Sequence, residues 1–141
     1  MVDWPFVEAM PGAESALRAL AGYSVRCVAT NATESDGTQV AAALDRVGLQ
    51  THLTHFLTSS ELGVSKPDPG FYEEVSRVLG IPPPALLAVG NDYEKDIVSA
   101  KAVGLITILV SSEGEPAFRE AADLIVPGLT DLPDLVGALL R

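Results

Sequence analysis

The sequence predicts a layered α/β domain with a mainly parallel sheet. Short apolar runs without polar alternation are typical of strands that are buried on both faces of a parallel sheet. Stretches with apolar residues at helical spacing lie between these runs, and the linkers are brief, so strand and helix alternate as in βαβ units. At 141 residues, the chain has the size of one domain. We therefore expect residues 1–141 to form a single domain.

Each element is predicted from its own pattern. The first helix opens with Pro11-Gly12, and the third and fourth helices end at Gly80 and Gly104. The predicted strands are residues 25–29, 55–58, 86–89, 105–110 and 123–126. The predicted helices are residues 12–20, 38–47, 71–79, 97–103 and 133–140.

Composition excludes several kinds of partner. The chain has 19 acidic and 9 basic residues, a formal charge of −10, which disfavours binding to nucleic acid or to an anionic membrane. No apolar run approaches the roughly 20 residues that span a bilayer. The single cysteine, Cys27, excludes an intramolecular disulfide and a cysteine-based zinc site, and we expect it to be an inert core thiol. These features predict a cytoplasmic protein.

Candidate site residues gather beyond the carboxyl ends of three predicted strands, where ligands bind in open α/β sheets. Hydroxyl groups and lysine suit phosphate oxygens, and carboxylates suit a hard cation such as Mg²⁺. The residues are Thr30 and Asn31 after the first strand, Lys66 in the loop after the second, and Asn91, Asp92 and Asp96 after the third.

Three segments resemble the second, third and fourth motifs of the haloacid dehalogenase-like (HAD) hydrolases, most of which are phosphatases. The first segment is a strand that ends in Thr30-Asn31, behind a helix that opens with Pro11-Gly12. The most specific match is SELGVSKPDPGFY, residues 60–72, and the acidic segment VGNDYEKDI follows at residues 89–97. The resemblance covers nearly the whole chain from Pro11-Gly12 onward and implies a Rossmann-like three-layer αβα fold.

The resemblance also implies roles for these residues. Thr30 and Asn31 would hold the phosphoryl group of a small phosphorylated molecule or of inorganic phosphate, and Lys66 would offset its charge. Asp92 and Asp96, with Asn91, would bind Mg²⁺. The family usually has Asp directly after the glycine, where this chain has Asn91, which can ligate a cation but carries no charge.

Simpler interpretations stay open for the same residues. Thr30 could merely end a strand, and Lys66 could be a solvated loop lysine. Asp92 and Asp96 could favour the positive end of a helix dipole. We expect His52 and His55 to be structural or surface residues, and Phe71 and Tyr93 to serve mainly in packing. The acids Glu113, Glu115, Glu120 and Asp123 are expected to form a solvated face.

The first family motif, Asp-x-Asp on a central strand, is not visible upstream of Pro11. In the family its first Asp attacks phosphorus and its second acts as acid and base. Asp3 is only a weak candidate, because the second position is Pro5, which cannot donate a proton. There is also no room for the helical cap domain between a first strand and the Pro11-Gly12 helix.

A missing central strand would leave backbone groups without partners in a buried sheet, at about 1–3 kcal/mol each. Four arrangements could compensate. The flanking strands could pair directly, or residues 4–7 could fill the gap. A second copy could donate a strand, which would make a homodimer, or the chain could be a fragment of a longer enzyme.

Three functions therefore compete. The resemblance favours an Mg²⁺-dependent phosphoester hydrolase of the HAD type that is impaired because it lacks a nucleophilic Asp. The retained binding motifs also fit a non-catalytic phosphate- or metal-binding or regulatory subunit. A receiver-like domain that binds a partner is disfavoured, because Lys66 precedes the acidic segment and no acceptor Asp ends an earlier strand.

Overall fold

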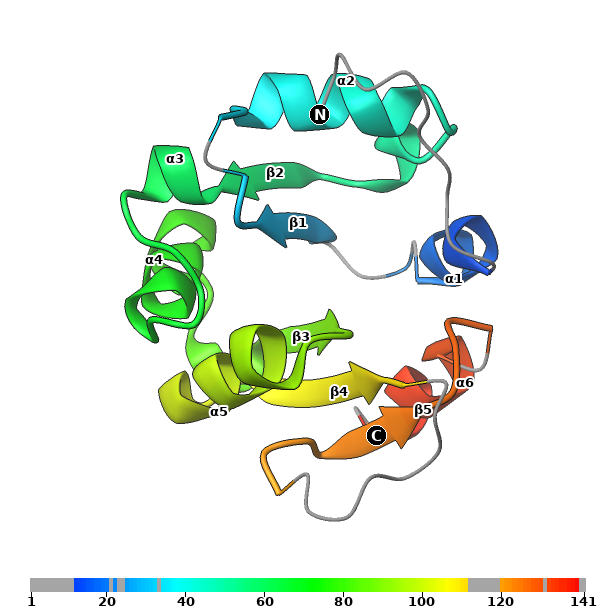
Figure 1. Cartoon of the computed structure of the whole chain (residues 1–141). Helices are drawn as coiled ribbons and strands as arrows, with labels where there is room; N and C mark the ends of the chain where they lie inside the picture. The colour runs from blue at the N-terminus through cyan, green and yellow to red at the C-terminus, as the bar shows by residue number, and fades with distance from the viewer. Residues whose placement is uncertain are drawn as a thin grey trace. The chain divides into compact units, whose positions relative to one another are not determined.

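The computed structural model describes residues 12–20, 22, 25–32, 34–111, 120–130 and 132–139. They divide into two compact units, one formed by the described residues up to Glu61 and from Gly128 onward, and the other by the described residues from Leu62 to Pro127. Each unit combines helices with a sheet whose strand pairs are all parallel (Figure 1). The predicted α/β class with parallel sheets is confirmed.

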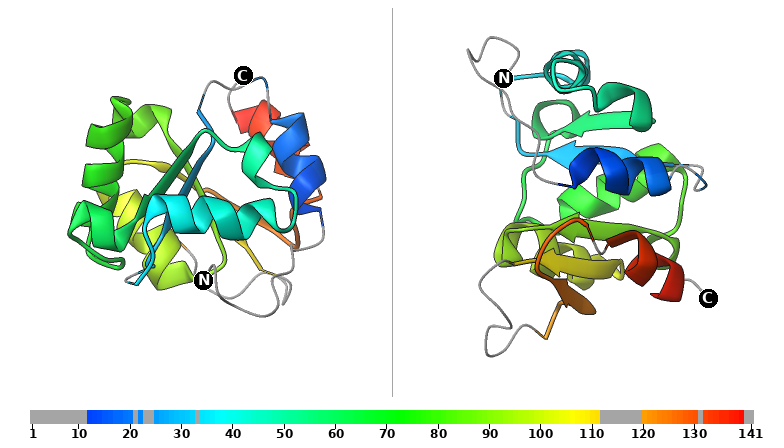
Figure 2. Two further views of the ribbon diagram at one scale, coloured as in Figure 1. Left: turned by 90° about the horizontal axis from the view of Figure 1, so that it is seen from above. Right: turned by 90° about the vertical axis from the view of Figure 1, so that its right-hand side faces the viewer.

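The first unit holds the sheet β1-β2. Strand β1 (Cys27–Thr30) pairs with β2 (His55–Thr58), with Cys27 opposite His55 and Thr30 opposite Thr58. The helical elements are α1 (Ala13–Ala19), α2 (Gly37–Asp45), the 3₁₀ turn η1 (Gln50–His52), the short α3 (Ser59–Leu62) that leads into the second unit, and α6 (Leu132–Leu139). Helix α2 packs against β2, and α1 contacts α6 (Figure 2).

Helix α2 begins where its sequence satisfies the first backbone donors. The Asp36 carboxylate accepts from the Gln39 amide at 2.9 Å, and the Gln39 side chain accepts from the Asp36 amide at 2.9 Å. This reciprocal capping box fixes the start of the helix. Val40 and Ala43 are fully buried along one stripe. Gly37 lies so close to the Phe56 carbonyl of β2 that a side-chain carbon there would overlap with it.

The second unit holds the sheet β3-β4-β5. Strand β3 (Leu87–Gly90) pairs with β4 (Ile106–Val110), and β4 pairs with β5 (Leu124–Val126). The helical elements are α4 (Gly70–Leu79), the 3₁₀ turn η2 (Pro83–Ala85), the π-helical turn η3 (Tyr93–Val98) and α5 (Ser99–Val103). Phe71, Ile97, Ala100 and Ile108 are fully buried and form the centre of this unit.

The predicted elements lie where the sequence placed them, with shifts of one or two residues at their ends. The main difference is the helix expected at residues 97–103. A π-helical turn begins earlier, at Tyr93, and only Ser99–Val103 is α-helical. Cys27 lies in β1 with intermediate exposure, so it is not part of the fully buried core. Burial nevertheless raises the pKa of its thiol to about 12, which disfavours the reactive thiolate.

Of the arrangements considered for a missing central strand, direct pairing of the flanking strands is not found: among the described strands, β1 and β3 belong to separate sheets. The others involve another chain, or residues outside those that the structure describes. Asp3 and residues 4–7 belong to that part of the chain, as do Glu113 and Glu115. The described strands form two sheets, in which β1 has β2 as its described neighbour and β3 has β4. In the described part of the chain, no helix is long and apolar enough to cross a membrane.

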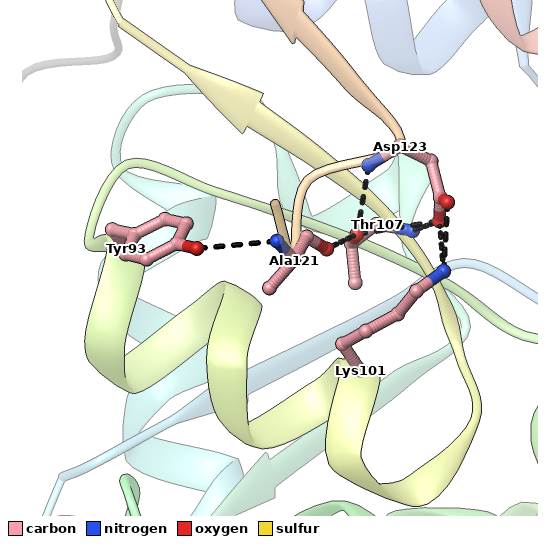
Figure 3. Close-up of polar contacts among 5 residues, drawn as sticks. All are labelled: Tyr93, Lys101, Thr107, Ala121 and Asp123. Atoms are coloured by element: carbon pink, nitrogen blue, oxygen red, sulfur yellow. Dashed lines mark hydrogen bonds and ion pairs between the residues drawn. The ribbon is translucent and has the colours of Figure 1, made fainter. Parts of the chain in front are cut away.

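Asp123 is exposed, as expected, but it is more than a solvated acid. Its carboxylate oxygens lie 2.7 Å from the Lys101 ammonium, and one of them accepts from the Thr107 amide at 2.8 Å (Figure 3). Partial burial acts to raise the pKa of Asp123, but the hydrogen bonds from Lys101 and Thr107 outweigh it and hold that pKa below its ordinary value. This group therefore joins α5 to the start of β5.

We predict that replacing Asp123 with Asn lowers the free energy of unfolding by about 1 kcal/mol at pH 7. Because the pKa is lower in the folded protein, the stabilisation is present above the ordinary carboxyl pKa and is lost as the pH falls through the folded value. Urea unfolding of wild type and Asp123→Asn at pH 7 and near pH 3 measures this. Glu120→Gln, at an exposed neighbouring acid, is the control. An equal difference in unfolding free energy between wild type and Asp123→Asn at both pH values would contradict the prediction.

Candidate functional site

The acidic turn after β3 carries three of the predicted site residues. Strand β3 ends at Gly90, and the exposed residues Asn91 and Asp92 follow. The Asp92 carboxylate accepts from the Lys95 amide at 3.0 Å and so caps the π-helical turn that begins at Tyr93. Such π-helical segments are frequent at functional sites. The turn therefore presents two carboxylates, Asp92 and Asp96, at the carboxyl end of a parallel strand.

Lys66 and Asp96 form an ion pair in the second unit. The Lys66 Nζ lies 2.7 Å from the Asp96 Oδ1, and the two side chains are 10% and 14% exposed. The ammonium also lies 5.4 Å from the centre of the buried Phe71 ring, within cation–π distance. A pair with so little exposure interacts more strongly than a pair on an open surface, but each charge depends on the other to offset its desolvation.

The second oxygen of Asp96 is also held. Asp96 Oδ2 accepts from the Asp92 amide at 3.1 Å. Gly90 makes this arrangement possible, because a side-chain carbon at that position would overlap with Asp96 Cβ and Oδ2. The carboxylate therefore lies directly over the last residue of β3.

The loop that carries Lys66 is folded back by short-range hydrogen bonds. The Asp68 amide donates to the Ser65 carbonyl at 3.0 Å, and the Asp68 carboxylate accepts from the Gly70 amide at 2.9 Å. Helix α4 begins directly after this loop and buries Phe71. The same segment therefore supplies the lysine and the ring beside which its ammonium lies. The solvated-loop alternative for Lys66 does not hold.

Thr30 and Asn31 belong to the first unit. Thr30 is the last residue of β1, half-buried, and pairs in register with Thr58. The Thr58 side chain is fully buried, and its hydroxyl lies 2.9 Å from both Ser60 Oγ and Glu61 Oε1. Hydroxyl side chains thus end both strands of this sheet. The structure brings Lys66, Asp92 and Asp96 together with Asn91 beside them, while Asp3 lies outside the described residues.

The oxygen ligands on the acidic turn fit a small hard cation. Mg²⁺ is commonly held by one or two carboxylates, with waters and substrate phosphate completing its shell. Asp92 and Asp96 supply two carboxylates and Asn91 an amide oxygen. Among the described residues, no three His, Cys, Asp or Glu side chains cluster as a metal site. Three oxygen groups would leave the rest of an Mg²⁺ shell to water and phosphate, and Lys66 would share Asp96 with such a cation.

Two residues that shape this site were not singled out as site residues. Gly90 creates the space for Asp96, and Phe71, expected mainly to pack, also lies beside the Lys66 ammonium. A glycine at the end of a buried strand, directly before an acidic segment, is the signal in the sequence that could have identified Gly90. Nothing in the spacing of Phe71 distinguishes it from other core residues.

Comparison with known proteins gives a consistent family. The sequence model of the haloacid dehalogenase-like hydrolases matches residues 4–104. A glyceraldehyde 3-phosphate phosphatase of Methanothermobacter thermautotrophicus is 36% identical over 77 residues, which cover 55% of this chain and 34% of that protein. The haloacid dehalogenase-like hydrolase domain-containing protein 3 of Bos taurus is 28% identical over 129 residues, covering 89% of this chain and 50% of that protein. The chain thus spans half or less of the length of these relatives.

Solved structures resemble the chain in fold. The 2-haloacid dehalogenase of Pseudomonas syringae matches with a TM-score of 0.78 and 25% identity, covering 94% of this chain and 55% of that one. A HAD phosphatase of Thermococcus onnurineus matches with a TM-score of 0.79 and 22% identity, covering 92% of this chain and 59% of that one. At this identity the match shows a likeness of fold alone. The predicted Rossmann-like fold is confirmed.

We predict that Gly90→Ala displaces Asp96 and lowers the free energy of unfolding by about 1–3 kcal/mol, the usual cost of forcing extra atoms into a packed site. Thermal and urea unfolding measure the change. Gly128→Ala is the matched control, because a side-chain carbon there has open space around it. Equal stability of the two variants would show that the space over Gly90 is not required.

Proposed function

The chain belongs to the haloacid dehalogenase-like hydrolases, and we propose that it binds the phosphate group of a small phosphorylated molecule together with Mg²⁺. The observation that carries this proposal is the Lys66–Asp96 pair at the carboxyl end of β3. A lysine and a carboxylate held at low exposure, with a second carboxylate on the same turn, offer partners for an anion and for a cation.

Lys66 is proposed as the anion-binding residue. Its ammonium has three donors, of which Asp96 takes one in the geometry described. The ammonium is a compact charge on a flexible stem, so it can turn toward a phosphate oxygen. Phe71 covers one side of the ammonium and so limits the directions in which it can donate. The lysine would contribute charge and orientation rather than a covalent bond.

Asp92 and Asp96 are proposed to hold Mg²⁺, with Asn91 as a neutral third ligand. When bound, the cation would offset the negative charge of phosphate oxygens. Asp96 is already oriented by Lys66 and by the Asp92 amide, so it needs little rearrangement to serve as a ligand. Because Asn91 brings no charge, we expect weaker Mg²⁺ binding than a third carboxylate would give.

Thr30 and Asn31 are proposed to bind the phosphoryl group on the strength of the motif that they match. Thr30 ends a parallel strand, and such ends are where ligands bind in sheets of this kind. A hydroxyl can donate to a phosphate oxygen, as can a backbone amide in a turn. Both residues belong to the first unit.

Hydrolysis by this chain alone is proposed not to exceed the uncatalysed rate. The family reaction needs a carboxylate that attacks phosphorus, and the sequence contains no Asp-x-Asp pair. Binding groups can stabilise a transition state, but they do not replace a nucleophile. A carboxylate supplied by another segment or a second copy would restore turnover.

The names of the relatives suggest a substrate class. They include a glyceraldehyde 3-phosphate phosphatase and, in Halopiger xanaduensis, a ribulose-1,5-bisphosphate 5-phosphatase that is 37% identical over 82 residues. Both act on phosphate esters of small carbon compounds. We propose a substrate or ligand of that class for this chain.

The alternative is a non-catalytic phosphate- or metal-binding subunit. The absent Asp-x-Asp pair favours it, because the chain keeps the binding residues of the family without the attacking one. Both functions share the same ligand, so binding and turnover must be measured separately.

We predict that inorganic phosphate with Mg²⁺ raises the melting temperature of the wild-type protein by about 3 °C at several times its dissociation constant. Lys66→Met should abolish this rise, because it removes the anion-binding charge. Lys95→Met, at an exposed lysine of the same turn, is the matched control and should keep it. Chloride at equal ionic strength separates specific binding from screening. An undiminished rise in Lys66→Met would contradict the proposed role of Lys66.

We predict that the chain hydrolyses an aryl phosphate with Mg²⁺ no faster than the protein-free control. Release of the aryl alcohol, followed by absorbance, measures the rate. Activity that disappears in Asp3→Asn would contradict this and identify Asp3 as the nucleophile. Activity that persists in Asp3→Asn but disappears in Asp96→Asn would contradict it as well and require another attacking group.

A further inference from the structure

Tyr93 links the acidic turn to a distant part of the second unit. It is the first residue of the π-helical turn, directly after Asp92. Its hydroxyl accepts a hydrogen bond from the Ala121 amide at 3.1 Å (Figure 3). Ala121 lies 28 positions later in the chain, shortly before β5. A single side chain thus ties the turn that carries Asp92 and Asp96 to the segment that enters the last strand of the sheet.

The distant end of this link is firmly anchored. The Ala121 carbonyl accepts from the Thr107 hydroxyl, and Thr107 is a fully buried residue of β4. Thr107 Oγ1 also accepts from the Asp123 amide at 3.1 Å, and the Asp123 carboxylate binds Lys101 of α5. Ala121 is therefore held on both its polar groups, with the central strand of the sheet as the support (Figure 3).

The near end of the link lies beside the carboxylates. The Asp92 amide, next to Tyr93 in the chain, donates to Asp96 Oδ2, and the Asp92 carboxylate accepts from the Lys95 amide. A shift of the Tyr93 backbone would therefore move the Asp92 amide, which donates to the Asp96 carboxylate. It would also move the Asp92 carboxylate relative to the Lys95 amide that donates to it. Hydrogen bonds outside the ligands that fix their orientation commonly tune a metal site.

We infer that Tyr93 is a positioning residue for Asp92 and Asp96, acting through its hydroxyl. Packing alone does not account for it, because a phenyl ring would fill the same space without accepting from Ala121. The cation-binding consequence of this inference rests on the proposed function, whereas the placement of the two carboxylates does not.

The direct test is residue-resolved amide hydrogen exchange of Tyr93→Phe, measured by NMR without metal. The amides of Asp92 and Lys95 report on the carboxylates that they bond. We expect both to exchange about two- to tenfold faster than in wild type, in line with the loss of one hydrogen bond. Tyr72→Phe, the same change on α4, is the matched control and should leave these two amides unchanged.

Two results would overturn the inference. If only the Ala121 amide exchanges faster, the hydroxyl serves that segment and not the carboxylates. If exchange rises uniformly, including at Ile108 in β4, Tyr93 is a general stabilising residue.

Titration with Mg²⁺ alone, followed by calorimetry, gives a second measurement. Tyr93→Phe should bind about two- to tenfold more weakly than wild type and Tyr72→Phe. Equal affinity would overturn the inference. If wild type itself binds no Mg²⁺, the proposed metal function fails, and the exchange experiment still decides the role of Tyr93.

Discussion

The ion pair between Lys66 and Asp96 is the constraint around which the second unit is arranged. It joins residues that are 30 positions apart, one in the loop before α4 and one on the turn after β3. Removing two charges from water is costly unless further contacts offset it. Phe71 beside the ammonium and the Asp92 amide on the carboxylate provide such contacts. Gly90 contributes by having no side chain, since any other residue would displace Asp96.

The charges of the proposed site follow from this pair. The charges of Lys66 and Asp96 cancel each other. The net charge of the four proposed site residues in this unit, which are Lys66, Asn91, Asp92 and Asp96, is therefore the single negative charge of Asp92. A phosphate dianion and a divalent cation would bring opposite charges to the same place, and their joint binding would leave that balance unchanged. With Asn91 as a neutral residue, the acidic turn attracts a cation less strongly than three carboxylates would. Phosphate and cation are therefore expected to bind better together than either does alone.

Local patterns in the sequence predict much of this fold. Buried runs such as residues 105–110 identify strands because the chain has no polar alternation there, and Gly80 and Gly104 mark helix ends through their left-handed backbone. The order of the motifs gave Lys66, Asp92 and Asp96 as neighbours. The spacing of residues along the sequence does not predict which distant segments contact each other. Thr107 lies in β4, Tyr93 in the π-helical turn and Asp123 directly before β5, and their hydrogen bonds depend on how these segments pack. The π-helical turn was also missed, since its pattern of apolar residues is close to that of an α-helix.

The two compact units differ in how the chain builds them. Leu62–Pro127 is one continuous stretch, whereas the other unit combines segments that precede and follow it, with α1 in contact with α6. During synthesis, segments emerge from the ribosome in order, and compact units fold as their last part becomes available. The central stretch can thus complete its sheet while the partner of α1 is still being translated. The Lys66–Asp96 pair lies within that central stretch, so it can form before α6 has been translated.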